Sequence, residues 1–287
     1  MAVKAHIRSN SFPSRTHPVN DNVEEQLLWL RSSEAASTSS SISSVCQKLG
    51  GLKDLLDSID DWLQLSHTQQ VLSNENRRKC VEDLLDGSLR TLDVCGTLRD
   101  VLSHMKGCIR ELESSFRRKR EVDLGLTSEV ESYIMSRKKM RKLISKTLES
   151  LKKMEKQSNQ NKAAEEDDEA ALDVLREVQQ INISVFESLL CFLSGKRTRS
   201  NGWSMGSKVM SAKRISCQAA ADANEVEALD SELVALKSSK VNGVQVRAAL
   251  KQAEALQSVI QEIEEVLECI FRCLVKTRVS LLNSISY

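Results

Sequence analysis

The sequence predicts an all-α fold, an elongated antiparallel helical bundle with coiled-coil-like long helices, and three observations support this prediction. The chain has 287 residues and two prolines, Pro13 and Pro18, so no proline interrupts a helix after residue 18. Aromatic residues make up only 3% of the chain, fewer than a packed β-sheet core normally uses. Apolar residues also recur every 3.5 positions over two long stretches, which is the spacing of a seam between supercoiled helices.

The first apolar repeat lies within residues 75–120, where ten steps cover 35 residues. Gly87, Gly96 and Gly107 interrupt it, and each costs about 1 kcal/mol relative to alanine in an exposed helix interior. We expect these glycines to allow the close approach of a neighbouring helix. The members of the repeat are Val81, Leu85, Leu89, Leu92, Cys95, Leu98, Leu102, Met105, Ile109, Leu112 and Phe116.

The second repeat begins at Val246 and ends at Leu281, and again ten steps cover 35 residues. Two seams of equal period pack well along their length, so we expect an antiparallel bundle. A homodimeric coiled coil would bury the same seams, and the sequence leaves this choice open. The members are Val246, Leu250, Ala253, Leu256, Ile260, Ile263, Leu267, Ile270, Leu274, Thr277 and Leu281.

Shorter periodic segments predict the remaining helices, which we place at 22–31, 42–65, 125–157 and 170–194, with one more ending near Asn242-Gly243. The pair Gly50-Gly51 predicts a kink or break inside the second of these helices.

The predicted domain organisation is a disordered regulatory tail at 1–20 followed by a helical bundle at 21–287. The Gly- and Ser-containing stretch 195–206 is the best loop in the chain. It divides the bundle into two candidate sub-lobes, 21–194 and 207–287.

The N-terminal tail contains the most specific short motif of the chain. Arg8, Ser9, Ser11 and Pro13 lie in the pattern R-S-x-S-x-P, which resembles the phosphoserine motif bound by 14-3-3 proteins. A phosphate adds nearly two negative charges that an arginine cluster can clamp. A chance match in a serine-rich tail is the alternative, and the tail's basic, acid-poor composition also resembles a targeting segment.

Charge is concentrated in residues 117–156, where thirteen Lys and Arg stand against six acids, a local excess of 13 − 6 = +7. Such a stretch can bind anionic lipid, an acidic partner or a nuclear import receptor. The alternative is a solvated helix face paired with acids of the last helix, such as Glu264 and Glu268. The predicted basic patch comprises Arg117, Arg118, Lys119, Arg120, Arg137, Lys138, Lys139, Arg141 and Lys142.

No motif in the sequence specifies a reaction, so we expect no enzyme, no metal site and no cofactor. Gly-rich phosphate loops, H-E-x-x-H and nucleophile elbows are missing from the sequence. His104 and Cys108 lie one helical turn apart, as do Cys269 and Cys273, but neither pair has the additional ligands that zinc requires. The eight cysteines form no C-x-x-C pair, so we expect reduced thiols packed as small apolar residues.

Overall charge and hydropathy limit the cellular compartments and the classes of partner that we expect for this protein. The formal net charge is only +1, so we do not expect a nucleic acid as partner. No stretch approaches eighteen apolar residues, so we expect no transmembrane helix. We expect a cytoplasmic rather than a secreted protein, with the nucleus and the chloroplast as alternatives.

Four segments resemble the BYPASS-like proteins, a plant-specific family of unknown biochemical function. They are His6-Ile-Arg-Ser-Asn-Ser-Phe-Pro-Ser-Arg with His17-Pro18, Leu84-Leu-Asp-Gly-Ser-Leu-Arg-Thr-Leu-Asp-Val-Cys-Gly96, Ser136-Arg-Lys-Lys-Met-Arg-Lys142 and Arg278-Val-Ser-Leu-Leu-Asn-Ser-Ile-Ser286. The resemblance spans nearly the whole chain. It implies a plant protein linked to root and shoot development. The resemblance assigns no catalytic or binding role to any residue of this chain.

Two classes of function therefore remain open. The first is a non-enzymatic helical scaffold or regulatory protein that binds a phosphoserine reader through its tail and other proteins along exposed helix grooves. The second is a peripheral membrane or organelle-associated protein that uses the basic 117–156 face. A homodimer is compatible with both classes.

Overall fold

The computed structural model describes residues 17–36, 41–118, 126–162, 170–195, 224–238 and 243–285, and within these ranges it contains helices and no strand. The predicted all-α class is therefore confirmed. A short 3-10 turn at Glu75–Arg77 precedes α4. The α-helices are α1 Pro18–Ala36, α2 Ile42–Leu63, α3 Ser66–Leu72, α4 Arg78–Arg118, α5 Leu126–Lys162, α6 Ala170–Ser194, α7 Glu225–Ser238 and α8 Gly243–Ile285.

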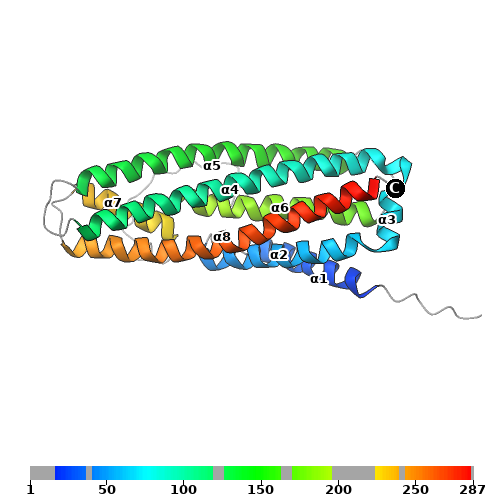
Figure 1. Cartoon of the computed structure of the whole chain (residues 1–287), viewed down its shortest axis with the longest axis horizontal. Coiled ribbons are helices and arrows are strands. Elements are labelled where there is room, and N and C mark those ends of the chain that lie inside the picture. Colours follow the sequence, from blue (N-terminus) through cyan, green and yellow to red (C-terminus); the bar gives the residue numbers. More distant parts are fainter. Residues whose placement is uncertain are drawn as a thin grey trace, which may run out of the picture.

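The two long apolar repeats pack against each other inside one chain, as the sequence predicted. α4 and α8 run antiparallel and make the most extensive contact among the described helices (Figure 1). Leu102 of α4 and Ile263 of α8 are both buried in this seam. α2 covers the other side of α8, and α5 lies along α4 and α6. The long helices run lengthwise beside one another, which makes the bundle elongated (Figure 1).

α6 and α7 follow each other end to end along the bundle, although 28 residues of sequence separate Gly195 from Asn224. Gly195 ends α6 with φ of +66°, a conformation that suits glycine. The Asn224 side chain donates from Nδ2 to the carbonyl of Phe192 at 3.0 Å, and its Oδ1 accepts from the backbone N–H of Glu227 at 2.7 Å. Asn224 therefore caps the start of α7 and satisfies the end of α6 at the same point.

The helix break expected at Gly50-Gly51 does not occur, because α2 is continuous from Ile42 to Leu63. A Cβ atom at position 51 would overlap the Trp29 ring of α1. Gly51 therefore lets α1 pack closely on α2. Gly51 alone of the pair marks a helix contact, because a Cβ atom at Gly50 would have no neighbour within 4 Å, and the predicted break was wrong.

Two expectations for the first repeat were also wrong in part. Leu89 is 46% exposed, because α4 turns position 88 toward α8, where Arg278 Nη1 donates to the Ser88 hydroxyl at 2.8 Å. Of the three glycines expected at helix contacts, Gly87 meets the side chain of Gln179. At Gly96 and Gly107, a Cβ atom would have no neighbour within 4 Å, so no other helix approaches these two positions closely.

The first helix begins at Pro18, four residues before the expected start, and ends at Ala36. Proline is favoured in the first turn of a helix because its missing N–H would have no helical partner there. The His17 carbonyl accepts from the N–H of Asn20 at 2.8 Å and so closes this first turn.

Candidate functional site

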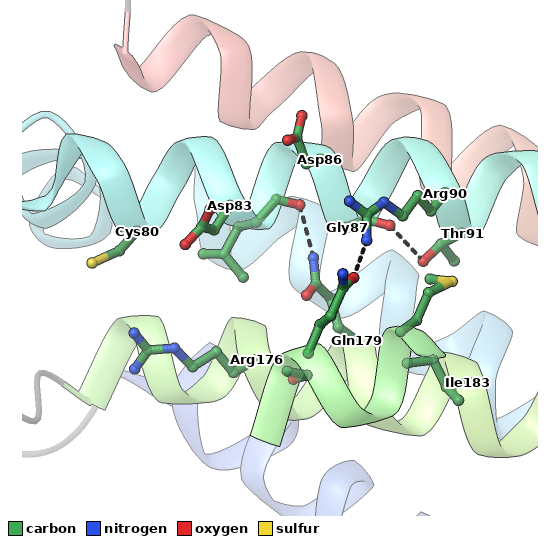
Figure 2. Close-up of a pocket in the computed structure, with 13 residues that line it drawn as sticks. Cys80, Asp83, Asp86, Gly87, Arg90, Thr91, Arg176, Gln179 and Ile183 are labelled. Carbon is green, nitrogen blue, oxygen red and sulfur yellow. Dashed lines mark hydrogen bonds between the residues drawn. The ribbon is translucent and has the colours of Figure 1, made fainter. Parts of the chain in front are cut away.

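A polar cavity of about 350 Å³ lies where α4, the C-terminal part of α5 and the N-terminal part of α6 meet. Figure 2 shows Gln179 of α6 reaching toward α4 beside Gly87. Its Nε2 donates to the carbonyl of Leu84 at 2.7 Å. A Cβ atom at position 87 would lie 2.5 Å from the same nitrogen, so the missing side chain of Gly87 makes room for this bond between helices.

Other polar groups of the cavity are also tied to the protein. Arg90 of α4 donates to the Gln157 amide oxygen of α5. Thr91 Oγ1 donates to the Gly87 carbonyl at 2.9 Å, and Arg176 Nη1 donates to Asp173 at 3.3 Å. The bonds from Arg90 and Gln179 hold three helices together around the cavity (Figure 2).

The cavity presents both signs of charge. Asp83 and Asp86 line it from α4, while Arg90 and Arg176 line it from α4 and α6. This arrangement can accept hydrogen bonds from a small polar molecule and donate them to it. Sequence reasoning missed this cavity, and the only local signal was the glycine at position 87.

Arg137 corrects the predicted basic patch, because its side chain is only 2% exposed. It points into the bundle, where Nη2 lies 3.0 Å and Nε 3.1 Å from the carboxylate of Asp230 on α7. Its Nη1 faces the sulfur of Met105 at 3.9 Å. Arg137 therefore fixes α7 to α5, since a buried guanidinium requires a paired carboxylate.

Arg141, one turn further along α5, joins the same cluster. Its Nη2 lies 2.8 Å from Asp230, and its Nε donates to the carbonyl of Ser194 at 3.1 Å. Nearby, burial raises the pKa of the Tyr133 phenol, and the negative charge of Asp230 acts in the same direction. We call Arg137, Arg141 and Asp230 the arginine clasp, because it joins α5, the end of α6 and α7.

The remaining residues of the predicted patch do not share one environment. Arg117 is paired with Glu254 of α8 at 2.9 Å. This ion pair agrees with the alternative interpretation, in which basic residues of the charge run pair with acids of the last helix. Arg118 is exposed, while Lys119 and Arg120 lie outside the described residues. Lys138, Lys139 and Lys142 are exposed on the outer side of α5.

These last three lysines belong to a larger set on the same helix. Seven exposed lysines of α5 form no ion pair with any residue that the structure describes. We call this set the outer lysine face. Its members are Lys138, Lys139, Lys142, Lys146, Lys152, Lys153 and Lys156.

The tail motif formed by Arg8, Ser9, Ser11 and Pro13 lies outside the described residues, so the phosphoserine interpretation stays a prediction.

No disulfide joins the cysteines of the described residues, and several of these thiols are poorly placed to react. Burial raises the pKa of Cys95 to about 12, and burial together with the Asp57 carboxylate does the same for Cys273. Cys108 lies 3.9 Å from the His104 ring. Over the described part of the chain, no cluster of three or more His, Cys, Asp and Glu could hold a metal ion.

Among the described helices, none combines the length and the apolar character that a membrane span requires.

These observations define the class of protein as an all-α bundle in which an internal arginine clasp and an exposed lysine face share one helix. The model of the family described as Protein BPS1 matches residues 48–284. The chain therefore belongs to the BPS1 family, which confirms the resemblance to BYPASS-like proteins and indicates a plant developmental protein of unknown biochemical function. Searches of curated proteins and of solved structures returned no match.

Proposed function

We propose that this protein is a non-enzymatic scaffold or regulatory protein that acts in plant root and shoot development. The supporting observation is an exposed apolar stripe on α8, formed by Val275, Val279 and Leu282 at intervals of four and three residues. Side chains at this spacing share one helix face, the arrangement through which helices bind partner proteins. Because the rest of α8 is packed on α4 and α2, the stripe is held on a firm support.

Proximity labelling in plant cells tests the scaffold proposal. We expect the double variant Val275→Ser/Val279→Ser to lose a defined subset of labelled proteins, and Ser11→Ala to lose those that read the phosphorylated tail. Val234→Ser changes an exposed valine on α7 and serves as the matched control. Identical labelled proteins for the native chain and all three variants would contradict the proposal.

A second candidate function is peripheral association with a membrane or organelle surface, and the outer lysine face supports it. Lysines on an exposed helix attract anionic headgroups, and each contributes about 1 kcal/mol close to such a surface. Co-sedimentation of the full chain with vesicles tests this candidate. We expect binding to vesicles that contain phosphatidylserine and none to purely zwitterionic vesicles, and equal recovery with both would contradict it.

A further inference from the structure

The outer side of α5 carries more than charge, because two large apolar side chains lie among its lysines. Met135 is 55% exposed and Leu143 is 42% exposed. They lie one helical turn before and one turn after Lys139, so all three share a face. A mixed apolar and basic face of this kind is typical of helices that lie in a membrane interface.

The lysines form a continuous row along this face. Lys139, Lys146 and Lys153 are spaced seven residues apart, which keeps them within about 40° of one another around the helix over roughly 21 Å. Within 138–156 the exposed acids are Glu149 and Glu155. The outer lysine face therefore keeps an excess of 7 − 2 = +5, with Arg141 left out because Asp230 already pairs with it.

The arginines and the lysines of α5 point in different directions. Arg137 and Arg141 turn toward the clasp, where a fixed carboxylate matches the guanidinium geometry. The outward basic side chains are all lysines, whose flexible stems carry point charges and require no fixed partner geometry. Such charges suit a fluid layer of phosphates better than the fixed carboxylate pattern of an acidic protein.

We propose that the outer side of α5 is the membrane-facing side of the bundle, with lipid phosphates bound by the outer lysine face and Met135 and Leu143 inserted among the headgroups. This inference rests on the proposed peripheral membrane function, and it adds how the bundle is oriented on the bilayer. The bundle lies flat, with its long axis parallel to the bilayer. α1 and α2 lie along the opposite long side (Figure 1), and α1 packs on α2 and α6. A bound bundle therefore presents α1 and α2 to the aqueous phase.

The test measures partition of the full chain onto vesicles of phosphatidylcholine with about 30 mol% phosphatidylserine. The triple variant Lys139→Gln/Lys146→Gln/Lys153→Gln should bind about 100-fold more weakly, since each lysine near an anionic surface contributes about fivefold. The matched control is Lys79→Gln/Lys251→Gln/Lys276→Gln, which removes the same charge from exposed lysines on α4 and α8. The control should lose less than about threefold.

The apolar contribution is tested separately by the double variant Met135→Ser/Leu143→Ser. It should weaken binding by about tenfold, and this ratio should persist at high salt, where the lysine contribution is screened. Both residues are exposed, so circular dichroism should show unchanged helix content for every variant.

The outcomes separate the orientation from the function. Equal loss in the triple variant and its control would overturn the orientation and leave peripheral membrane binding standing. Failure of the native chain to bind either vesicle would overturn both. Binding to a soluble acidic polypeptide with no binding to vesicles would show that the lysines serve a protein partner, and it would also overturn the inference.

Discussion

The two sides of α5 use the same kind of charge in different ways. On the inner side, Arg137 and Arg141 are held by one carboxylate, Asp230, and they join three helices. On the outer side, the outer lysine face points to solvent without an ion pair among the described residues. A basic run in a sequence is therefore not one site, because the fold places some of its members in internal ion pairs and leaves others exposed.

The largest expected effect comes from a substitution in the arginine clasp, on the inner side of α5. Arg137→Met should lower the free energy of unfolding by about 3 kcal/mol, because it removes one partner of a buried ion pair and leaves Asp230 with Arg141 alone. Urea denaturation followed by circular dichroism measures this loss. Lys138→Met, at the next residue on the outer side, should change the value by less than about 0.5 kcal/mol. Similar losses for both variants would remove the distinction between the two sides.

Glycines extend the comparison to other helices, beginning with one that faces inward. Gly51→Ala should lower the free energy of unfolding by about 1–2 kcal/mol, because the new methyl group would overlap the Trp29 ring. The same denaturation experiment measures it, and Trp29 fluorescence should shift as the ring moves. A stabilised variant would mean that α1 does not pack on α2 at this point.

An outward glycine should behave in the opposite way. Gly107→Ala should raise the free energy of unfolding by about 0.5–1 kcal/mol, since Gly107 is exposed inside α4 and no atom beyond its own turn of the helix lies within 4 Å of the added group. A thermal melt would show a small increase in Tm. Destabilisation would contradict the structure, in which no other described helix contacts Gly107.

The smallest expected effect depends on pH. Burial raises the pKa of Glu113, the Glu254 charge adds to this, and Arg117 opposes it. A carboxyl whose pKa is raised by folding destabilises the folded state when ionised, so stability should increase as pH falls through the folded pKa. Glu113→Gln should therefore raise the free energy of unfolding at pH 7, by no more than ~1 kcal/mol. At a pH below the unfolded-state pKa, both states of the native chain are protonated and the difference should vanish; a difference independent of pH would exclude this explanation.

The helical fold followed from the sequence because a seam needs only a regular apolar spacing. Leu102 and Ile263 are buried where the 3.5-residue repeats placed them. The prediction for Leu89 was wrong because a strict repeat fixes spacing and not direction, and Ser88 lies on the side that Arg278 contacts. Periodicity alone could not distinguish these two neighbours.

The arginine clasp was missed although the sequence held a signal for it. The apolar repeat of α5 runs through Tyr133 and Met140 and skips the turn between them, and Arg137 occupies that buried position. Its partner Asp230 lies 93 residues away on another helix, so no local pattern connects the two. The polar cavity was missed for the same reason, since Gly87 and Gln179 meet only after α4 and α6 have packed.

The difference between the two sides of α5 is tested most directly by lysine modification of the full chain, followed residue by residue with mass spectrometry. Reductive methylation rates are measured with and without vesicles containing phosphatidylserine. We predict that these vesicles slow the modification of Lys139, Lys146 and Lys153, while Lys79 and Lys251 keep their rates. Equal protection of all five lysines, or none, would contradict a binding role for the outer side of α5.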